Sequence, residues 1–333
     1  MRISVVIATK NRAGLLAITL DHLRRQQYAE GDEVIVVDNN SEDRTAAVVR
    51  DGAVGFPVPL HYLLELAPGK SRAVNAGVAG STGDVLALTD DDVQPAGDWI
   101  AAIRDVFSDR ALMLAGGRVD AWWEAPCPWW LRPCEPDAEY PVMFSPLALL
   151  HYGPTQPLGV RAAIGANLIV RREVFVELGG FAPHLGRTHG TLLCGEDHDF
   201  CDRAASANYR CEYRPEIRVR HWVPAARTRL RYYLRWFFWS GITNAILEGA
   251  LARPGPHVAR QPALTHMLRR LCGEAWQIAA AIATARPADS VAHLMEAAFA
   301  VGYLSAGARF WPRPHPPSAT AERAGIGDAA RSG

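Results

Sequence analysis

The chain has 333 residues, 49% of them hydrophobic, which is enough to bury the core of one large domain or two smaller ones. Lysine plus arginine and aspartate plus glutamate number 35 each, and the resulting formal charge of zero excludes the strongly basic proteins that coat nucleic acids. The six cysteines include no CxxC pair, so we expect no zinc site.

The first third of the chain alternates short apolar runs with helical patterns. Strands are predicted over residues 3–8, 33–38, 60–64 and 85–89 and helices over 12–27, 43–51 and 71–79, with Ser41 as the N-cap of the second helix. This alternation is typical of an α/β fold in which helices cover a mostly parallel sheet. Right-handed crossovers place the carboxyl ends of these strands at one edge, where open α/β sheets bind ligands.

The rest of the chain divides into a Pro- and Trp-rich segment, a second α/β half and a helical extension. The segment spans residues 120–158, and a strand at 165–171 and helices at 172–178 and 197–207 follow it. Residues 228–308 read as mostly helical, with interruptions at 254–256 and 286–287. We therefore expect an α/β domain over 1–225 (halves 1–119 and 120–225), a helical extension over 226–311 and a flexible tail over 312–333.

Three consecutive carboxylates, Asp90-Asp91-Asp92, follow the predicted strand at 85–89. They are too crowded to stay charged without a cation. Alternate side chains of an extended segment share one side, so Asp90 and Asp92 can face one ligand. Such oxygen ligands suit Mg²⁺ or Mn²⁺, which in turn binds substrate phosphates. The alternative is an acidic turn before the helix that begins near Asp98.

Polar turns also follow the other strands at the same predicted edge. Side chains after the first two strands can bind a nucleobase or ribose, and the start of the third helix offers backbone donors and cations for phosphates. Each turn alone is common, but together they indicate a nucleotide site. The residues are Thr9, Asn11 and Arg12, then Asp38, Asn39 and Ser41, then Lys70, Arg72 and Asn75.

These motifs resemble the family 2 glycosyltransferases of the GT-A fold. The resemblance covers residues 2–120 and resumes at Gly165-Ala166-Asn167-Leu168 and at Gly195–Phe200; its motifs are Ser4–Thr9 with Asn11-Arg12, Val36–Asn39 with Ser41 and Asp43, Asn75-Ala76-Gly77, and Asp90-Asp91-Asp92. It implies an inverting enzyme that moves a sugar from a UDP- or dTDP-sugar to a hydroxyl of a glycan, a lipid-linked saccharide or a glycosylated metabolite. Cell-surface polysaccharide synthesis is the process that this activity suits.

The resemblance also implies roles for single residues. Asp38 contacts the base with help from Thr9 and Arg72. Asp90 and Asp92 bind the ribose and the metal-diphosphate, with Mn²⁺ or Mg²⁺ as the metal, and Asp91 assists with ribose or sugar. His221, which we place after a predicted strand, is a candidate third contact of the metal or diphosphate; a structural histidine is the alternative.

A second acidic pair, Glu196-Asp197, begins a predicted helix after the Gly190–Gly195 stretch. An inverting transfer needs a carboxylate that takes the proton of the acceptor hydroxyl, while a metal stabilises the departing diphosphate. The resemblance places the base in this pair. We assign it to Asp197, with Glu196 supporting it or binding the acceptor. The alternative is that both carboxylates only stabilise a helix N-terminus.

The aromatic residues and the location of the chain leave alternatives open. Trp122, Trp123, Trp129 and Trp130 either stack on sugar rings or anchor their segment to the core. Residues 228–244 combine arginines with aromatics, as in an interfacial membrane helix beside a lipid-diphosphate acceptor, or as in a helix packed on the catalytic domain. Without a signal peptide or an apolar span of about 20 residues, we expect a cytoplasmic protein with peripheral contact to the inner membrane face through 228–244 and the C-terminal helices.

Two other functions fit part of the pattern. A sugar-phosphate nucleotidyltransferase also pairs a nucleotide with a carboxylate-bound metal, but Ala8–Arg12 lacks the glycines of its N-terminal loop. A non-catalytic nucleotide-sugar-binding module would keep the fold, but the two acidic clusters favour an enzyme. An NAD-dependent oxidoreductase is disfavoured because no GxGxxG follows the first strand.

Overall fold

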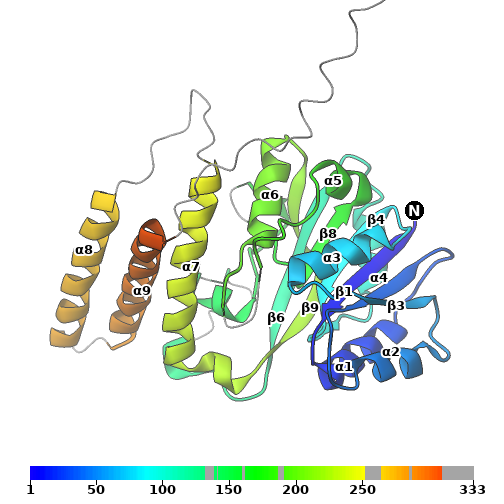
Figure 1. Ribbon diagram of the computed structural model, residues 1–333, viewed down its shortest axis with the longest axis horizontal. Coiled ribbons are helices and arrows are strands. Elements are labelled where there is room, and N and C mark those ends of the chain that lie inside the picture. The colour runs from blue at the N-terminus through cyan, green and yellow to red at the C-terminus, as the bar shows by residue number, and fades with distance from the viewer. Residues whose placement is uncertain are drawn as a thin grey trace, which may run out of the picture.

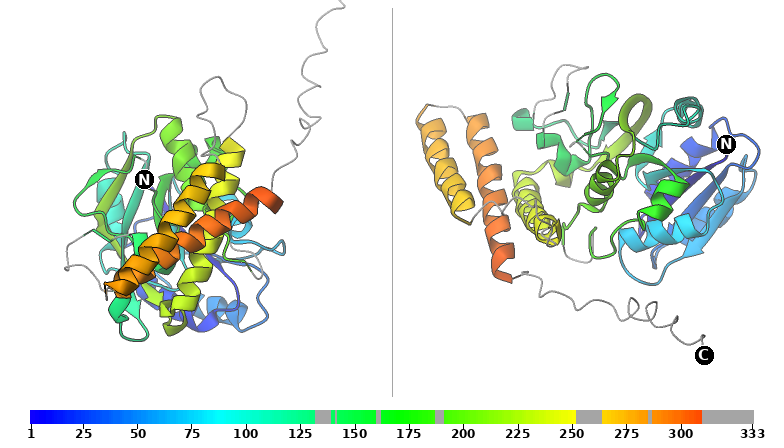
Figure 2. Two further views of the ribbon diagram at one scale, coloured as in Figure 1. Left: turned by 90° about the vertical axis from the view of Figure 1, so that its left-hand side faces the viewer. Right: turned by 90° about the horizontal axis from the view of Figure 1, so that it is seen from above.

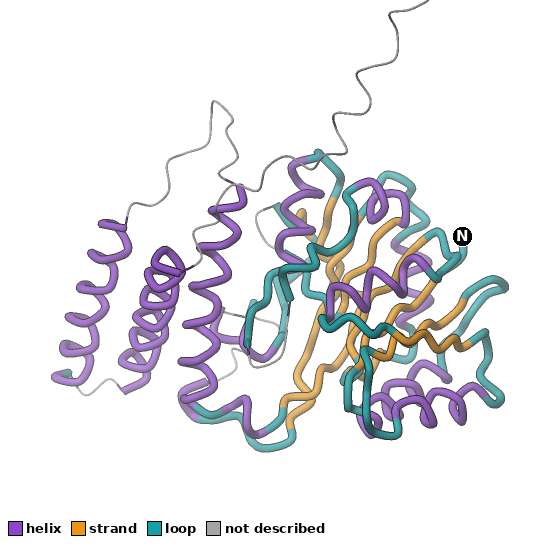
Figure 3. The backbone as a smooth tube through the Cα atoms, in the orientation of Figure 1, coloured by secondary structure: helices purple, strands orange, loops and turns teal. Residues whose placement is uncertain are grey.

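A mixed nine-stranded sheet forms the centre of the described chain (Figures 1 and 3). The computed structural model describes residues 1–131, 139–140, 142–159, 162–186, 191–251, 264–284 and 287–309. The strand order is β3-β2-β1-β4-β8-β6-β9-β5, with β7 paired to β9. The strands are β1 Ile3–Thr9, β2 Glu33–Asp38, β3 Leu60–Leu64, β4 Val85–Asp90, β5 Val93–Pro95, β6 Leu114–Trp123, β7 Gln156–Pro157, β8 Asn167–Arg171 and β9 Cys211–Val223.

Helices cover both faces of the N-terminal half of this sheet. The helices are α1 Ala13–Arg24, α2 Thr45–Ala53, α3 Lys70–Ala79, α4 Trp99–Val106, α5 Arg172–Glu177, α6 Glu196–Ser206, α7 Leu230–Leu251, α8 Leu264–Ala283 and α9 Pro287–Arg309, with short 3-10 turns η1 Trp129–Leu131, η2 Val142–Leu147 and η3 Ala225–Thr228. The run Val34–Val37 is buried on both sides: Ile35 and Val37 pack with Ala73 of α3, and Val34 and Val36 belong to the main core with residues of α1. Such continuous apolar strands are typical of a parallel sheet with two covered faces.

Strands β3, β2, β1 and β4 run parallel, as predicted, and their carboxyl ends lie side by side. In register, Thr9 of β1 pairs with Asp38 of β2, and Ala8 pairs with Asp90 of β4. The close approach of α3 to this sheet depends on Gly77, because a Cβ atom there would lie 2.5 Å from Val6 and 2.8 Å from Val37 side-chain atoms. The α/β fold class is therefore confirmed.

The C-terminal half of the sheet corrects two sequence predictions. Strand β6 continues through Trp122 to Trp123, where we expected irregular chain from residue 120, because it pairs with β9 in parallel register over Arg118–Trp123. His221 lies within β9, where we expected it to follow a strand, and it pairs with Val93 of β5. Both features depend on pairing between distant segments, which local patterns do not reveal.

Helix α2 begins at Thr45, and Ser41 is not its N-cap as predicted. The hydroxyl of Ser41 instead accepts a hydrogen bond from the backbone N–H of Asn11, at 2.8 Å. Asp43 supplies the oxygen near the helix start, because its Oδ1 accepts from the backbone N–H of Thr45 at 3.0 Å. Asp43, two residues closer to the helix than Ser41, therefore bonds its first backbone N–H, while the N-cap position itself is Arg44.

The last three helices form a layer at one end of the molecule, with α9 between α7 and α8 (Figures 1 and 2). Two glycines allow α7 and α9 to touch: a Cβ atom at Gly241 would lie 2.1 Å from the carbonyl oxygen of Phe299, and one at Gly302 would lie 1.9 Å from that of Phe238. The predicted interruption at 254–256, Arg286 and the tail from 312 lie outside the described residues.

Helix α7 packs against the catalytic domain, and the contact of residues 228–244 with a membrane stays a prediction. Its aromatic residues Tyr233 and Phe237 are buried, whereas Arg231 and Arg235 are exposed. Among the helices that the structure describes, none has the length and apolar character that crossing a bilayer requires.

Candidate active site

The carboxyl ends of the parallel strands open into a cavity of about 840 Å³ that continues to α7 and α9. Its walls bring together residues that are far apart in the sequence. They include Thr9, Arg12, Lys70, Asp90, Asp197 and His221. The sheet edge that the sequence predicted as a ligand site is therefore the floor of the main cavity in the described chain.

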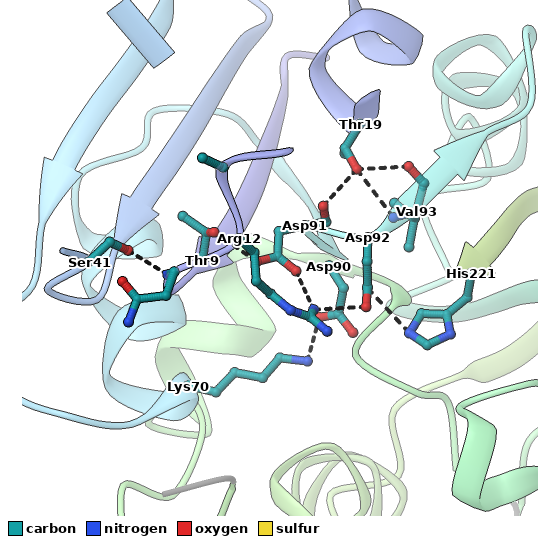
Figure 4. A network of polar contacts seen from close by, with 12 residues as sticks. Thr9, Arg12, Thr19, Ser41, Lys70, Asp90, Asp91, Asp92, Val93 and His221 are labelled. Carbon is teal, nitrogen blue, oxygen red and sulfur yellow. Dashed lines mark hydrogen bonds and ion pairs between the residues drawn. The ribbon is translucent and has the colours of Figure 1, made fainter. Parts of the chain in front are cut away.

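The three aspartates of the triplet are neutralised by basic side chains from other elements (Figure 4). Asp90, the last residue of β4, forms an ion pair with Lys70 at the start of α3. The Arg12 Nη1 atom lies 2.7 Å from Asp91 Oδ1 and 2.8 Å from Asp92 Oδ2. The other Asp91 oxygen accepts a hydrogen bond from the Thr9 hydroxyl at 2.7 Å.

The pKa values of two of these carboxyls shift in opposite directions. It raises the pKa of Asp91 to about 6, although the charge of Arg12 acts to lower it. Burial acts on Asp92 as well, but the charge and hydrogen bond of His221, together with Arg12, hold the pKa of Asp92 below its ordinary value. Asp92 therefore stays ionised to a lower pH than Asp91, and an ionised carboxylate is what a metal ligand requires.

Asp90, Asp92 and His221 could hold a metal ion. One potential ligand atom from each lies within 4.8 Å of the others, and His221 Nε2 lies 3.3 Å from Asp92 Oδ1. His221 Nδ1 is buried without a hydrogen-bond partner among the described residues, and His221 Nε2 is the group that Asp92 Oδ1 faces. Two carboxylates and an imidazole are a donor set that suits Mn²⁺. The residues therefore fit the ion that the sequence predicted.

Asp38 and Asn39, two of the predicted nucleotide contacts, are held by hydrogen bonds to other groups of the chain. Asp38 is 2% exposed; its Oδ1 accepts from the Ser41 backbone N–H at 2.8 Å and its Oδ2 from the Tyr62 hydroxyl at 2.9 Å. Burial and this hydrogen bond raise the pKa of Tyr62 to about 12. The Asn39 side-chain amide donates hydrogen bonds to the Glu65 and Ala67 carbonyls and accepts one from the Gly69 N–H. It therefore positions the loop before Lys70.

Asp38 does not line the cavity, and neither do four other predicted nucleotide contacts, Asn11, Ser41, Arg72 and Asn75. Asn75 exchanges two hydrogen bonds with the backbone of Phe181, at 2.8 and 2.9 Å, and so ties α3 to the chain after α5. Arg72 is exposed on α3. Asn11 has a φ of 53° and its Oδ1 accepts from the Glu42 N–H at 2.7 Å, so it joins two of the strand-end turns.

The second acidic pair begins α6, as predicted, and lines the same cavity. Asp197 Oδ2 accepts a hydrogen bond from the Gly165 N–H at 3.0 Å, which fixes its carboxylate beside the turn before β8. Glu196 is buried, its Oε2 has no hydrogen-bond partner among the described residues, and burial raises its pKa to about 7 with a further contribution from Asp197.

Lys70 connects the two acidic clusters. Burial would lower its pKa, but the charges of Asp90 and Glu196, with a smaller contribution from Asp197, raise it above the ordinary value. A Cβ atom at Gly165 would lie 3.3 Å from Lys70 Nζ and 3.9 Å from Asp197 Oδ2, so both groups lie close to this glycine. The triplet and the Glu196-Asp197 pair therefore interact electrostatically with the same lysine.

Sequence reasoning missed the cavity wall that the C-terminal helices provide. This wall includes Trp236, Ser240, Thr243 and Asn244 of α7, Arg270 of α8, and Glu296 and Phe299 of α9. The α7 residues of this wall recur at a spacing of three or four, which could have predicted that they share one helix face. The face that meets the cavity depends on tertiary packing.

This fold, with its two acidic clusters, is that of a glycosyltransferase that uses nucleotide sugars. The family model Glycosyl transferase family 2 matches residues 4–179, just over half of the chain, and the chain belongs to this family. The resemblance seen in the sequence motifs is thus confirmed, and so is the GT-A fold.

Individual relatives are more distant. The chain is 27% identical over 259 residues to the glucosyl-dolichyl phosphate glucuronosyltransferase of Haloferax volcanii, which covers 74% of this chain and 78% of that protein. It is 29% identical over 235 residues to the pre-mycofactocin glycosyltransferase of Mycobacterium tuberculosis, covering 70% of this chain and 44% of that protein. The solved structure of the mannosyltransferase PcManGT from Pyrobaculum calidifontis in complex with GDP-Man and Mn²⁺ has a TM-score of 0.59 at 21% identity, over 90% of this chain and 86% of that one.

Proposed function

We propose that this glycosyltransferase moves a sugar, with inversion, from a UDP- or dTDP-sugar to a hydroxyl of a glycan, a lipid-linked saccharide or a glycosylated metabolite. One observation carries the proposal: a group fit to hold a divalent metal (Asp90, Asp92 and His221) and a backbone-anchored carboxylate (Asp197) line one cavity and share Lys70. Inverting transfer requires these two functions, leaving-group stabilisation and proton removal, on opposite sides of one sugar.

The donor would lie along the strand ends. We assign the base and ribose to the corner of Thr9, Asp38 and Asn39. A carboxylate accepts hydrogen bonds only, so Asp38 suits the imide N–H of uracil or thymine once the Tyr62 hydroxyl leaves its Oδ2. Arg12 and Lys70 form ion pairs with the triplet, and they would then supply the positive charge that faces the diphosphate.

Asp90, Asp92 and His221 would hold Mn²⁺ or Mg²⁺. That PcManGT was solved with GDP-Man and Mn²⁺ supports this assignment. The bound ion supplies Lewis-acid stabilisation of the departing nucleoside diphosphate.

The proton chemistry falls to the second acidic pair. We assign the general base to Asp197, because the Gly165 N–H holds its carboxylate toward the cavity. The acceptor oxygen bonds to the anomeric carbon, its proton passes to Asp197, and the bond between that carbon and the diphosphate breaks. Glu196, whose buried carboxyl has a pKa raised to about 7, would support this step through its electrostatic interactions with Asp197 and Lys70. A lipid-linked acceptor is among the candidates because the H. volcanii relative is named for glucosyl-dolichyl phosphate.

A donor panel tests this function. Release of nucleoside diphosphate is measured from UDP-, dTDP- and GDP-sugars, with and without Mn²⁺. We expect Mn²⁺-dependent release from a UDP- or dTDP-sugar. Release only from GDP-sugars would contradict the base assignment, and equal release in the presence of a metal chelator would contradict the metal assignment.

A further inference from the structure

One face of α7 lines the same cavity as the acidic clusters. Trp236, Ser240, Asn244 and Leu247 recur along this 22-residue helix at intervals of three or four residues, which places them in one row. Helix α9 packs beside this row, where Gly241 of α7 meets the Phe299 backbone. The row and Phe299 therefore line the cavity together.

This row is fixed against the segment that carries the proposed base. The Cys194 N–H donates to the Thr243 hydroxyl at 3.5 Å. Gly195, with a φ of +102°, sits so close to α7 that a Cβ atom would lie 2.8 Å from Thr243 Cγ2 and 3.5 Å from Leu247 Cδ1. Since Glu196 and Asp197 follow directly, an acceptor whose hydroxyl reaches Asp197 lies alongside the α7 face.

The chemistry of this wall matches a sugar ring. Trp236 and Phe299 offer flat apolar faces, and Ser240 offers a hydroxyl that donates and accepts hydrogen bonds. Asn244 adds an amide, whose Nδ2 also donates to the Ser240 carbonyl oxygen at 2.9 Å. A pyranose has the complementary surface, with one face of C–H groups and a rim of hydroxyls. A few polar groups on a mainly apolar wall are the usual composition of a small-molecule site.

The charges of this wall cancel. Arg270 forms an ion pair with Glu296, and its guanidinium lies 5.3 Å from the centroid of the Phe299 ring. The remaining lysines and arginines among the cavity residues are Lys10, Arg12, Lys70 and Arg227, from the strand-end turns, α3 and η3. Arg227 lowers the pKa of Asp92, which places its charge near the triplet. The cations that could bind a phosphate group therefore lie near the triplet, where we propose that the donor binds. The α7 wall suits a neutral ligand.

We propose that Trp236, Ser240, Asn244 and Phe299 form the acceptor subsite and hold a neutral pyranose, the sugar that receives the new bond. The inference rests on the proposed function. A free saccharide and a lipid-linked saccharide both present this ring, and the acceptors below distinguish them.

The test uses the full chain, Mn²⁺ and the donor that the panel identifies. Nucleoside diphosphate release is measured alone and with methyl and decyl glycosides of glucose, galactose, mannose and N-acetylglucosamine, and with farnesyl phosphate. We expect at least one neutral glycoside to raise release above the acceptor-free rate. A preference for decyl over methyl glycosides of one sugar would indicate a lipid-linked acceptor, and equal use a free saccharide.

Trp236→Ala should lower the glycoside-stimulated rate about tenfold or more, mainly through KM, because truncating an aromatic side chain that the bound sugar would cover removes much of the binding energy. Trp236→Phe should restore most of it. Trp276→Ala is the matched control, since Trp276 is 73% exposed on α8 and outside the cavity. Nucleotide affinity and thermal unfolding show that each variant is folded.

The failures are distinguishable. If no donor releases nucleoside diphosphate, the proposed function fails. If a donor is used but release is stimulated only by farnesyl phosphate, or by no glycoside, or equally in Trp236→Ala, the acceptor subsite is wrong while the proposed function stands.

Discussion

The Arg12 guanidinium lies on one edge of Asp92, with Nη1 2.8 Å from Oδ2, while the other oxygen of this carboxylate faces His221. Asp90 is likewise paired with Lys70. The proposed metal ligands are thus neutralised by cations of the chain itself. A divalent ion would have to share or displace these contacts, and the released side chains would then face the diphosphate.

This arrangement predicts a competition between Lys70 and the metal. Lys70→Met should tighten Mn²⁺ binding about tenfold in the absence of nucleotide, because it removes a positive charge in contact with a proposed ligand. Arg25→Met, which breaks only the exposed pair with Asp21, is the control. Calorimetric titration with Mn²⁺ measures the effect. Unchanged or weaker Mn²⁺ affinity in Lys70→Met would contradict the competition.

A pH-dependent stability is expected from Glu196. Burial raises its pKa in the folded chain to about 7 from an ordinary value of 4.5, so the folded state binds the proton more tightly. The stabilisation is fully present below about pH 4.5 and is lost as the pH rises through about 7.

Glu196→Gln removes this titration. Its free energy of unfolding relative to the wild type should therefore rise, by about 3 kcal/mol, between about pH 4 and about pH 8. Urea unfolding at a series of pH values measures the difference. A difference that is constant with pH would contradict the buried, raised state of Glu196.

Asn167 is a buried polar cross-link between β8, α4 and the long strands. It is 0% exposed, donates to the Arg118 and Ile217 carbonyls at 3.0 and 2.8 Å, and accepts from Trp99 Nε1 at 3.0 Å. Asn167→Leu leaves these three groups unpaired and should cost about 3 kcal/mol of unfolding free energy. Gln277→Leu on the exposed side of α8 should change it by less than about 0.5 kcal/mol. Similar urea midpoints for both variants would refute the cross-link.

The contact of α7 and α9 predicts opposite effects for two glycine substitutions. Gly302→Ala places a Cβ atom 1.9 Å from the Phe238 carbonyl oxygen, so the helices must separate at a cost of about 2 kcal/mol. A Cβ atom at Gly273 of α8 meets nothing within 4 Å, so Gly273→Ala should stabilise the chain by about 0.5–1 kcal/mol through helix propensity. Thermal unfolding distinguishes the two, and equal shifts would contradict the tight crossing.

Local sequence patterns predicted the strand ends well because each depends on a short apolar run followed by polar residues. Thr9, Asp38 and Asp90 lie at neighbouring carboxyl ends as expected. Asp90 and Asp92 also approach one another, although Asp91 and Asp92 lie in a turn after β4 rather than in an extended strand. The turn, and not the alternation of side chains along a strand, orients Asp91 so that it contacts Thr9 and Arg12.

Features that depend on distant pairing were not predictable. The place of His221 beside Asp92 follows from the pairing of β9 with β5, and the α7 wall follows from helix packing. Asn75 belongs to a motif of the family resemblance, yet its amide is used on the Phe181 backbone, which no local pattern shows. The division of the chain near residue 225, just before α7, stays a proposal.

The division of labour between the two acidic clusters is the central claim, and one paired measurement tests it most directly. Mn²⁺-dependent binding of the nucleoside diphosphate and the rate of sugar transfer are compared for Asp92→Asn and Asp197→Asn. We expect Asp92→Asn to lose both. Asp197→Asn should keep nucleotide affinity within about twofold while transfer falls at least about 100-fold. Transfer at the wild-type rate in Asp197→Asn, or loss of its nucleotide binding together with transfer, would contradict the account.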